Sequence, residues 1–178
     1  MQFANRIEAG RLLAKKLTAY SNRSDVVVLA LPRGGVPVAY EVAHALNAPL
    51  DVFLVRKLGV PGHEEMAMGA IASGNVQVLN RELVDYLGIP DELIDQVAAS
   101  EQHELERREK LYRGSSQPVN VGDRTVIIVD DGLATGSTMR AAIEALKKMG
   151  PARIIVAVPV AARDACESFK DEVDSTCV

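Results

Sequence analysis

Short apolar runs alternate with amphipathic segments along most of the chain. Residues 26–31 (VVVLAL) and 125–129 (TVIIV) are continuous apolar runs, the pattern of strands that are buried on both faces of a sheet. Strands that alternate with helices predict an α/β fold with a mainly parallel central sheet flanked by helices. We also expect helices at 5–20, from the turn after residue 35 to about residue 46, from residue 138 onward, and at 161–169. Further strands are expected at 50–55, 154–158 and 172–177, and a pair of short strands within 68–79.

Residues 80–113 interrupt this alternation. They are predicted to be helical, with Pro90 restarting the helix at its first helical position. Residues 91–113 carry seven acidic and four basic side chains. We therefore expect a helical insert, whose role is left open between a lid, a dimer contact, a cover for a bound base and a solvated helical hairpin.

Length and composition indicate one globular domain spanning residues 1–178, with 48% hydrophobic and 25% charged residues. The formal net charge of −4 argues against nucleic acid as the main partner, because proteins that bind phosphate backbones are usually basic. We find no signal-peptide pattern and no apolar run approaching the roughly 20 residues of a membrane span. These features predict a cytoplasmic protein without a membrane partner.

The most informative stretch is VIIVDDGLATGST, residues 126–138. Two carboxylates follow an apolar strand, and a turn of small and hydroxyl residues leads into a helix. Small residues let backbone N–H groups approach an anion, and a helix N-terminus adds a positive dipole. Adjacent carboxylates suit sugar hydroxyls or a magnesium ion. The stretch therefore predicts a site for a phosphorylated sugar; the structural alternative is a capped helix start with solvated aspartates.

The chain lacks the motifs of two other nucleotide-binding classes. An apolar strand ending in two aspartates also occurs in P-loop ATPases, but the chain lacks the motif GxxxxGK followed by Ser or Thr. The dinucleotide-binding motif GxGxxG is absent as well. Both classes are therefore disfavoured.

The same stretch resembles the 5-phosphoribosyl 1-pyrophosphate (PRPP) binding signature of type I phosphoribosyltransferases. That signature has four apolar residues, two acidic residues and a loop ending in Thr-Gly-x-Thr. The positions that fill it are Val126, Ile127, Ile128, Val129, Asp130, Asp131, Thr135, Gly136 and Thr138. The resemblance implies the Rossmann-like type I phosphoribosyltransferase fold, over roughly residues 25–79 and 124–160.

This resemblance assigns roles to the residues of the motif. The acidic pair Asp130 and Asp131 would hold the ribose hydroxyls and, indirectly, magnesium. The loop that follows would wrap the 5-phosphate. The residues of this region implied to bind PRPP are Asp130, Asp131, Gly132, Leu133, Ala134, Thr135, Gly136, Ser137 and Thr138.

A second loop matches the family's pyrophosphate loop. Residues 32–35 follow the first core strand and offer the cation Arg33 and the two glycines Gly34 and Gly35, which allow backbone N–H groups to approach an anion. Arg56 and Lys57 close the next strand, where the family carries cations that meet pyrophosphate. The structural alternatives are an ordinary strand-to-helix turn and solvated cations.

Residues 56–67, rich in Gly and Pro, match the position of the family's flexible catalytic loop. Within it His63 could help to neutralise the departing pyrophosphate, and Glu65, or its neighbour Glu64, could act on the incoming base. The catalytic residues implied by the resemblance are Arg33, Lys57, His63, Glu65 and Asp131.

The implied function is transfer of a phosphoribosyl group from magnesium-bound PRPP to a nitrogenous base or amine, with release of pyrophosphate. The alternative is a non-catalytic regulator that binds PRPP or a nucleotide through the same fold. Ala134 stands where 6-oxopurine enzymes of the family carry Asp, which argues against hypoxanthine or guanine as the base. Adenine enzymes also carry Ala there, and orotate enzymes, which differ at this position too, remain an alternative. Family members are commonly homodimers. The base-contacting hood of the family is not identifiable in the sequence.

Overall fold

The computed structural model describes residues 3–177 and has a five-stranded parallel sheet at its centre. The strand order is β2-β1-β6-β7-β8, and every neighbouring pair is parallel. The predicted mainly parallel sheet is therefore confirmed. Its strands are β1 Val26–Ala30, β2 Leu50–Val52, β6 Thr125–Val129, β7 Arg153–Ala157 and β8 Ser175–Cys177.

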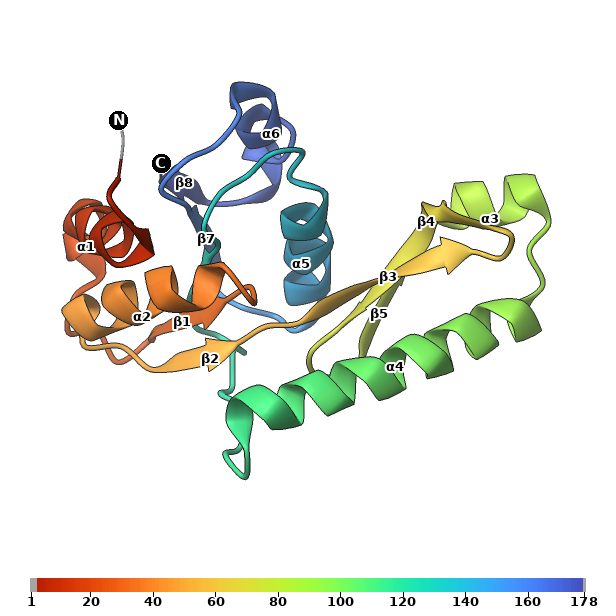
Figure 1. Cartoon of the computed structure of the whole chain (residues 1–178), viewed down its shortest axis with the longest axis horizontal. Coiled ribbons are helices and arrows are strands. Elements are labelled where there is room, and N and C mark those ends of the chain that lie inside the picture. The colour runs from red at the N-terminus through yellow and green to blue at the C-terminus, as the bar shows by residue number, and fades with distance from the viewer. Residues whose placement is uncertain (1–2, 178) are drawn as a thin grey trace.

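Helices cover both faces of this sheet (Figure 1). Alternate residues of the strands point to opposite faces. Val28 and Ile127 pack with α1 and α2 on one face, whereas Val27 and Ile128 pack with α5 and α6 on the other. The two apolar runs are thus buried on both faces, as predicted. The helices are α1 Arg6–Lys16 and α2 Gly35–Leu46 on one side and α5 Ser137–Lys148 and α6 Arg163–Glu167 on the other, with short 3-10 turns η1 Thr18–Tyr20 and η2 Lys170–Glu172.

A second, antiparallel sheet of three strands projects from this core (Figure 1). The long helix α4 runs along it, and Ile94 and Leu105 of α4 are buried against Leu58 and Met68 of the sheet. The insert is therefore a packed helix with an apolar core of its own rather than a solvated hairpin. The elements of this projection are β3 Val55–Val60, β4 His63–Ala72, β5 Val76–Leu79, α3 Arg81–Leu87 and α4 Asp91–Arg113.

The predicted loop at 56–67 is wrong as secondary structure. These residues form most of a β-hairpin, in which β3 pairs with β4 around a turn at Pro61 and Gly62. Gly59 lies at a β-bulge, where the register shifts. The Gly and Pro residues that indicated a loop therefore make the bulge and the turn of a hairpin.

Two element boundaries also differ from the prediction. The expected strand at 50–55 is split, because the chain leaves the central sheet after Val52 and enters β3 at Val55. The helical segment at 80–113 and its restart near Pro90 are confirmed, since α3 and α4 are separated at Gly88, which adopts a left-handed conformation with φ 62°. Pro90 is the N-cap of α4 and not its first helical residue.

One ion pair joins the projection to the core, and a second lies within the projection. Arg113 at the end of α4 pairs with Asp51 of β2 at 2.7 Å, and both side chains are largely buried. Arg56 of β3 pairs with Glu101 of α4 at 2.6 Å. α4 is therefore held against the carboxyl-end side of β2. Among residues 3–177, no helix is both long enough and apolar enough to cross a membrane.

Candidate functional site

Two loops meet at the carboxyl ends of the neighbouring strands β1 and β6, which is where ligands bind in open α/β sheets. A β-carbon placed on Gly34 would lie 2.1 Å from Oδ2 of Asp131, and one on Gly35 would lie 2.7 Å from the carbonyl oxygen of Val129. Glycine is therefore required at both positions for the loops to approach. The Pro32–Arg33 peptide bond, just before these glycines, is cis.

The acidic pair lies in the crevice between the loops. Asp130 Oδ1 accepts a hydrogen bond of 2.8 Å from the backbone N–H of Asp131. Burial, together with the negative charge of Asp131, raises the pKa of Asp130 to about 7. Asp131 Oδ2 accepts hydrogen bonds from Nε and Nη2 of Arg6, at 2.9 and 2.7 Å. The pair therefore combines a half-buried carboxyl group with a carboxylate paired to a cation.

Residues 130–136 form the turn between β6 and α5, and Ser137 and Thr138 are the first two residues of the helix. Leu133 is buried and exchanges backbone hydrogen bonds with Val160 and Ala162, which fixes the base of the turn. Gly136 has φ 73° and is the N-cap of α5 without a capping side chain. The N–H of Ser137 donates a hydrogen bond of 3.4 Å to Oγ1 of Thr135, whereas the next N–H groups of α5, those of Thr138 and Met139, remain available to an anion. The residues exposed at the rim are Ala134, Thr135, Ser137 and Thr138.

Lys57 links the projecting hairpin to this turn. Its Nζ donates a hydrogen bond of 2.8 Å to Oγ of Ser137. The structure thus brings Lys57 next to the start of α5, whereas the resemblance assigned it to pyrophosphate, and that role remains a prediction.

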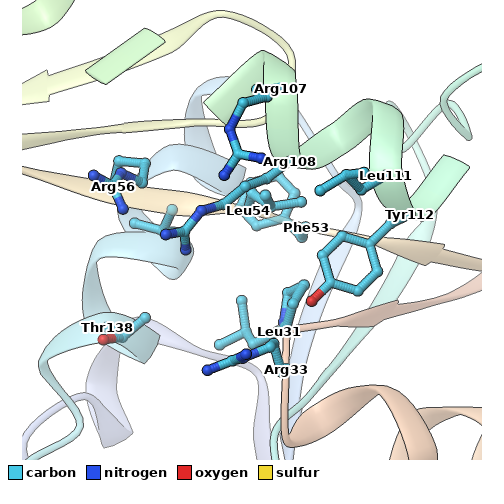
Figure 2. Close-up of a pocket in the computed structure, with 12 residues that line it drawn as sticks. Leu31, Arg33, Phe53, Leu54, Arg56, Arg107, Arg108, Leu111, Tyr112 and Thr138 are labelled. Atoms are coloured by element: carbon cyan, nitrogen blue, oxygen red, sulfur yellow. The ribbon is translucent and has the colours of Figure 1, made fainter. Parts of the chain in front are cut away.

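A cavity of about 420 Å³ opens beside the loop that follows β1 (Figure 2). Arg33 and Arg56, both predicted from the sequence, line it. Arg107 and Arg108 reach into the same space from α4, opposite Arg33 (Figure 2). Tyr112 of α4 closes one side. The structure therefore gathers four arginine side chains around a cavity beside the loop that follows β1.

His63 and Glu65 are not brought to this site. Both are exposed on β4 near the hairpin turn, where His63 pairs with Val60. That end of the hairpin lies beside α3, away from the central sheet (Figure 1). Their catalytic roles remain predictions.

Three arginines of the site were not predicted from the sequence. Arg6 lies 125 residues from its partner Asp131, and no local motif marks it. Arg107 and Arg108 follow the pattern of a solvated helix face, since acidic residues surround them. Only the packing of α4 against β3 places them beside the loop that follows β1.

The fold and this site define a Rossmann-like α/β protein in which two adjoining loops, after β1 and after β6, meet at an acidic pair. The chain belongs to the phosphoribosyl transferase domain family, whose model matches residues 3–178. The match therefore includes the insert and both ends of the chain, beyond the segments at 25–79 and 124–160 that carry the resemblance.

Individual relatives agree with this assignment. The chain is 43% identical over 172 residues to Rv0571c of Mycobacterium tuberculosis, which is provisionally named a phosphoribosyl transferase. The aligned residues cover 97% of this chain and 39% of that protein. The chain therefore spans about two fifths of the length of this relative.

Solved structures show the same fold. TT1426 from Thermus thermophilus superposes with a TM-score of 0.86 at 41% identity, over 99% of this chain and 83% of that one. A purine phosphoribosyltransferase from Pyrococcus horikoshii superposes with a TM-score of 0.54 at 21% identity, again over 99% and 83%. The fold is that of type I phosphoribosyltransferases.

Proposed function

We propose that this chain binds PRPP with magnesium and transfers its phosphoribosyl group to a nitrogen of a base or amine, releasing pyrophosphate. The observation that carries the proposal is the direct contact between the two loops. Gly34 approaches Asp131 so closely that no side chain fits between them. A ribose held by the acidic pair would therefore present its anomeric carbon next to the loop that is proposed to hold pyrophosphate.

Each part of PRPP has a matching group. The uncapped N–H groups of α5 and the hydroxyls of Thr135, Ser137 and Thr138 suit the 5-phosphate. The carboxylates of Asp130 and Asp131 can accept hydrogen bonds from ribose hydroxyls. The remaining members of the proposed PRPP site are Arg33, Gly34, Gly35, Arg56, Lys57, Gly132, Leu133, Ala134 and Gly136.

The donor set also suits magnesium. Magnesium is usually held by one or two carboxylates together with substrate phosphates and water. Asp130 and Asp131 provide two adjacent carboxyl groups, whereas residues 3–177 contain no cluster of three or more His, Cys, Asp or Glu side chains that could hold a metal ion alone. When bound, the ion would neutralise charge on the pyrophosphate.

The chain's cations would stabilise the leaving group during the reaction. The bond between the anomeric carbon and pyrophosphate breaks, the bond to the acceptor nitrogen forms, and negative charge accumulates on pyrophosphate. Arg33, Arg56 and Lys57 lie where preorganised positive charge lowers the energy of that state. His63 and Glu65 could act on pyrophosphate or the base only if the hairpin turn approached the strand ends.

Turnover tests this proposal. Pyrophosphate release from PRPP and magnesium would be followed with adenine, other bases and simple amines in turn. We expect release with at least one acceptor. The D130N/D131N variant should release none while keeping its fold. Binding of PRPP without release for any acceptor would favour the non-catalytic regulator instead.

A cytoplasmic homodimer is proposed on the family resemblance. Sedimentation velocity at several concentrations would measure the oligomeric state.

A further inference from the structure

The insert helix α4 forms one wall of the cavity beside the proposed pyrophosphate loop. Arg107, Arg108 and Tyr112 of α4 line it together with Arg33 from the loop after β1 (Figure 2). None of the residues predicted to bind PRPP belongs to the insert. The sequence thus assigns no individual residue of α4 to the site, whereas the structure places two of its cations beside the loop that follows β1.

The charges around this cavity do not balance. Arg107 and Arg108 share one carboxylate, Glu104, whose oxygens accept hydrogen bonds of 2.7–2.9 Å. Arg56 pairs with Glu101 at 2.6 Å, and Arg33 forms no ion pair with any residue of 3–177. Four guanidinium groups therefore face two carboxylates. The site has surplus positive charge for a multiply charged anion.

The pairing with Glu104 can be exchanged at small cost. The side chains of Arg107 and Arg108 are 56% and 46% exposed, and exposed ion pairs contribute little to stability. Guanidinium groups bind phosphate oxygens through two parallel hydrogen bonds, which adds strength and orientation. An anion with several oxygens would therefore compete well with a single shared carboxylate.

α4 holds these two arginines at a defined place. Leu105, next to Glu104, is 1% exposed and packs in the core of the projection. The end of the helix is fixed to β2 by the buried pair of Arg113 with Asp51. Arg107 and Arg108 lie between these two anchors, so that their position depends on packed structure rather than on a loop.

We propose that α4 supplies the outer half of the pyrophosphate site, with Arg107 and Arg108 leaving Glu104 to bind pyrophosphate oxygens opposite Arg33. The inference rests on the proposed function and extends it to the insert. Without the anion, Glu104 pairs with both guanidinium groups, and the anion replaces Glu104 when it binds.

The test is a set of calorimetric titrations with pyrophosphate, PRPP and ribose 5-phosphate, all with magnesium. R107A/R108A should weaken pyrophosphate and PRPP binding by about 10- to 100-fold, because charge-assisted hydrogen bonds to phosphate are lost. Ribose 5-phosphate, which lacks the diphosphate, should bind as it does to the wild type. R81A/K110A is the control, since it removes the same charge from exposed positions that do not line the cavity.

E104Q provides a second variant that removes no side chain from the packed core. It should strengthen pyrophosphate binding about threefold, because the arginines lose their competing carboxylate. The inference is overturned if R107A/R108A leaves pyrophosphate affinity unchanged, or if it weakens ribose 5-phosphate equally. A wild-type protein that binds neither PRPP nor ribose 5-phosphate would instead overturn the proposed function itself.

Discussion

Gly34→Ala separates the role of the two adjoining loops in binding from their role in folding. Gly34 has φ −63° and ψ −34°, a conformation that alanine adopts without strain. The new β-carbon would lie 2.1 Å from Oδ2 of Asp131, about 1.3 Å closer than ordinary contact at 3.4 Å. The clash is with a side chain, so Asp131 can move away. A displacement of about 1 Å of a positioned group can cost roughly 100-fold in function.

We therefore expect Gly34→Ala to weaken PRPP binding and pyrophosphate release by about 100-fold, with a change in unfolding free energy within about 1 kcal/mol. Gly35→Ala is the contrasting variant, because its β-carbon would meet backbone atoms of Val129 and Asp130 at 2.7 and 2.9 Å. Backbone of a buried strand cannot move aside, and overpacking costs about 1–3 kcal/mol.

The assays are calorimetric titration with PRPP and equilibrium unfolding in urea. Gly122→Ala serves as the matched control, since the nearest atom to its β-carbon would be 3.4 Å away, which is ordinary contact. Wild-type PRPP affinity in Gly34→Ala would refute the reasoning. So would a loss of stability in Gly34→Ala as large as that in Gly35→Ala.

Three further expectations concern single groups. The pKa of Asp130 is raised from 3.8 to about 7 in the folded chain, so its contribution to the unfolding free energy falls as pH rises from 3.8 through 7. A ligand that requires the Asp130 carboxylate should accordingly bind more tightly as pH rises toward 7, and its binding near pH 6 should release protons from the protein. Calorimetric titrations in two buffers of different ionisation enthalpy would measure this release. Binding that does not depend on pH would contradict the expectation. Arg113→Ala should lower the unfolding free energy in urea by about 3 kcal/mol, because Asp51 would remain buried without its partner, and a cost below about 1 kcal/mol would contradict that. Arg33→Ala should weaken pyrophosphate binding in calorimetry but not ribose 5-phosphate binding, and equal losses would argue against its assigned place.

The central layer of the fold could be predicted because its signals are local. The run 26–31 is apolar at every position and the run 125–129 at every position after Thr125, and such strands must be buried on both faces. The turn at 130–138 was also readable, because its glycines, hydroxyls and carboxylates follow one another in the chain. The fold class and the candidate phosphate loop could therefore be predicted from short stretches of sequence.

The projecting hairpin could not be predicted from the same kind of signal. Residues 63–67 (HEEMA) are exposed and show no alternation of apolar and polar positions. Their strand exists because β3 and β5 pair with the rest of β4, and this pairing is tertiary. A Gly- and Pro-rich segment without alternation then resembles a loop.

The arginines of the insert illustrate a different limit. Arg107 and Arg108 each form an ion pair with Glu104, three and four positions earlier on the same helix, a spacing typical of solvated helix surfaces. Whether such a face meets solvent or a binding cavity depends on the direction in which the helix packs. That direction is set by contacts with β2 and β3, distant in sequence.

The most direct test of the central claim is calorimetric titration of the wild-type chain with PRPP, with and without magnesium, beside the D130N/D131N variant. We expect magnesium-dependent binding at one site per chain and a large loss of affinity in the variant, whose thermal unfolding should stay close to that of the wild type. Absence of PRPP binding by the wild type, or equal binding by the variant, would contradict the assignment of residues 130–138 as the ribose and phosphate site.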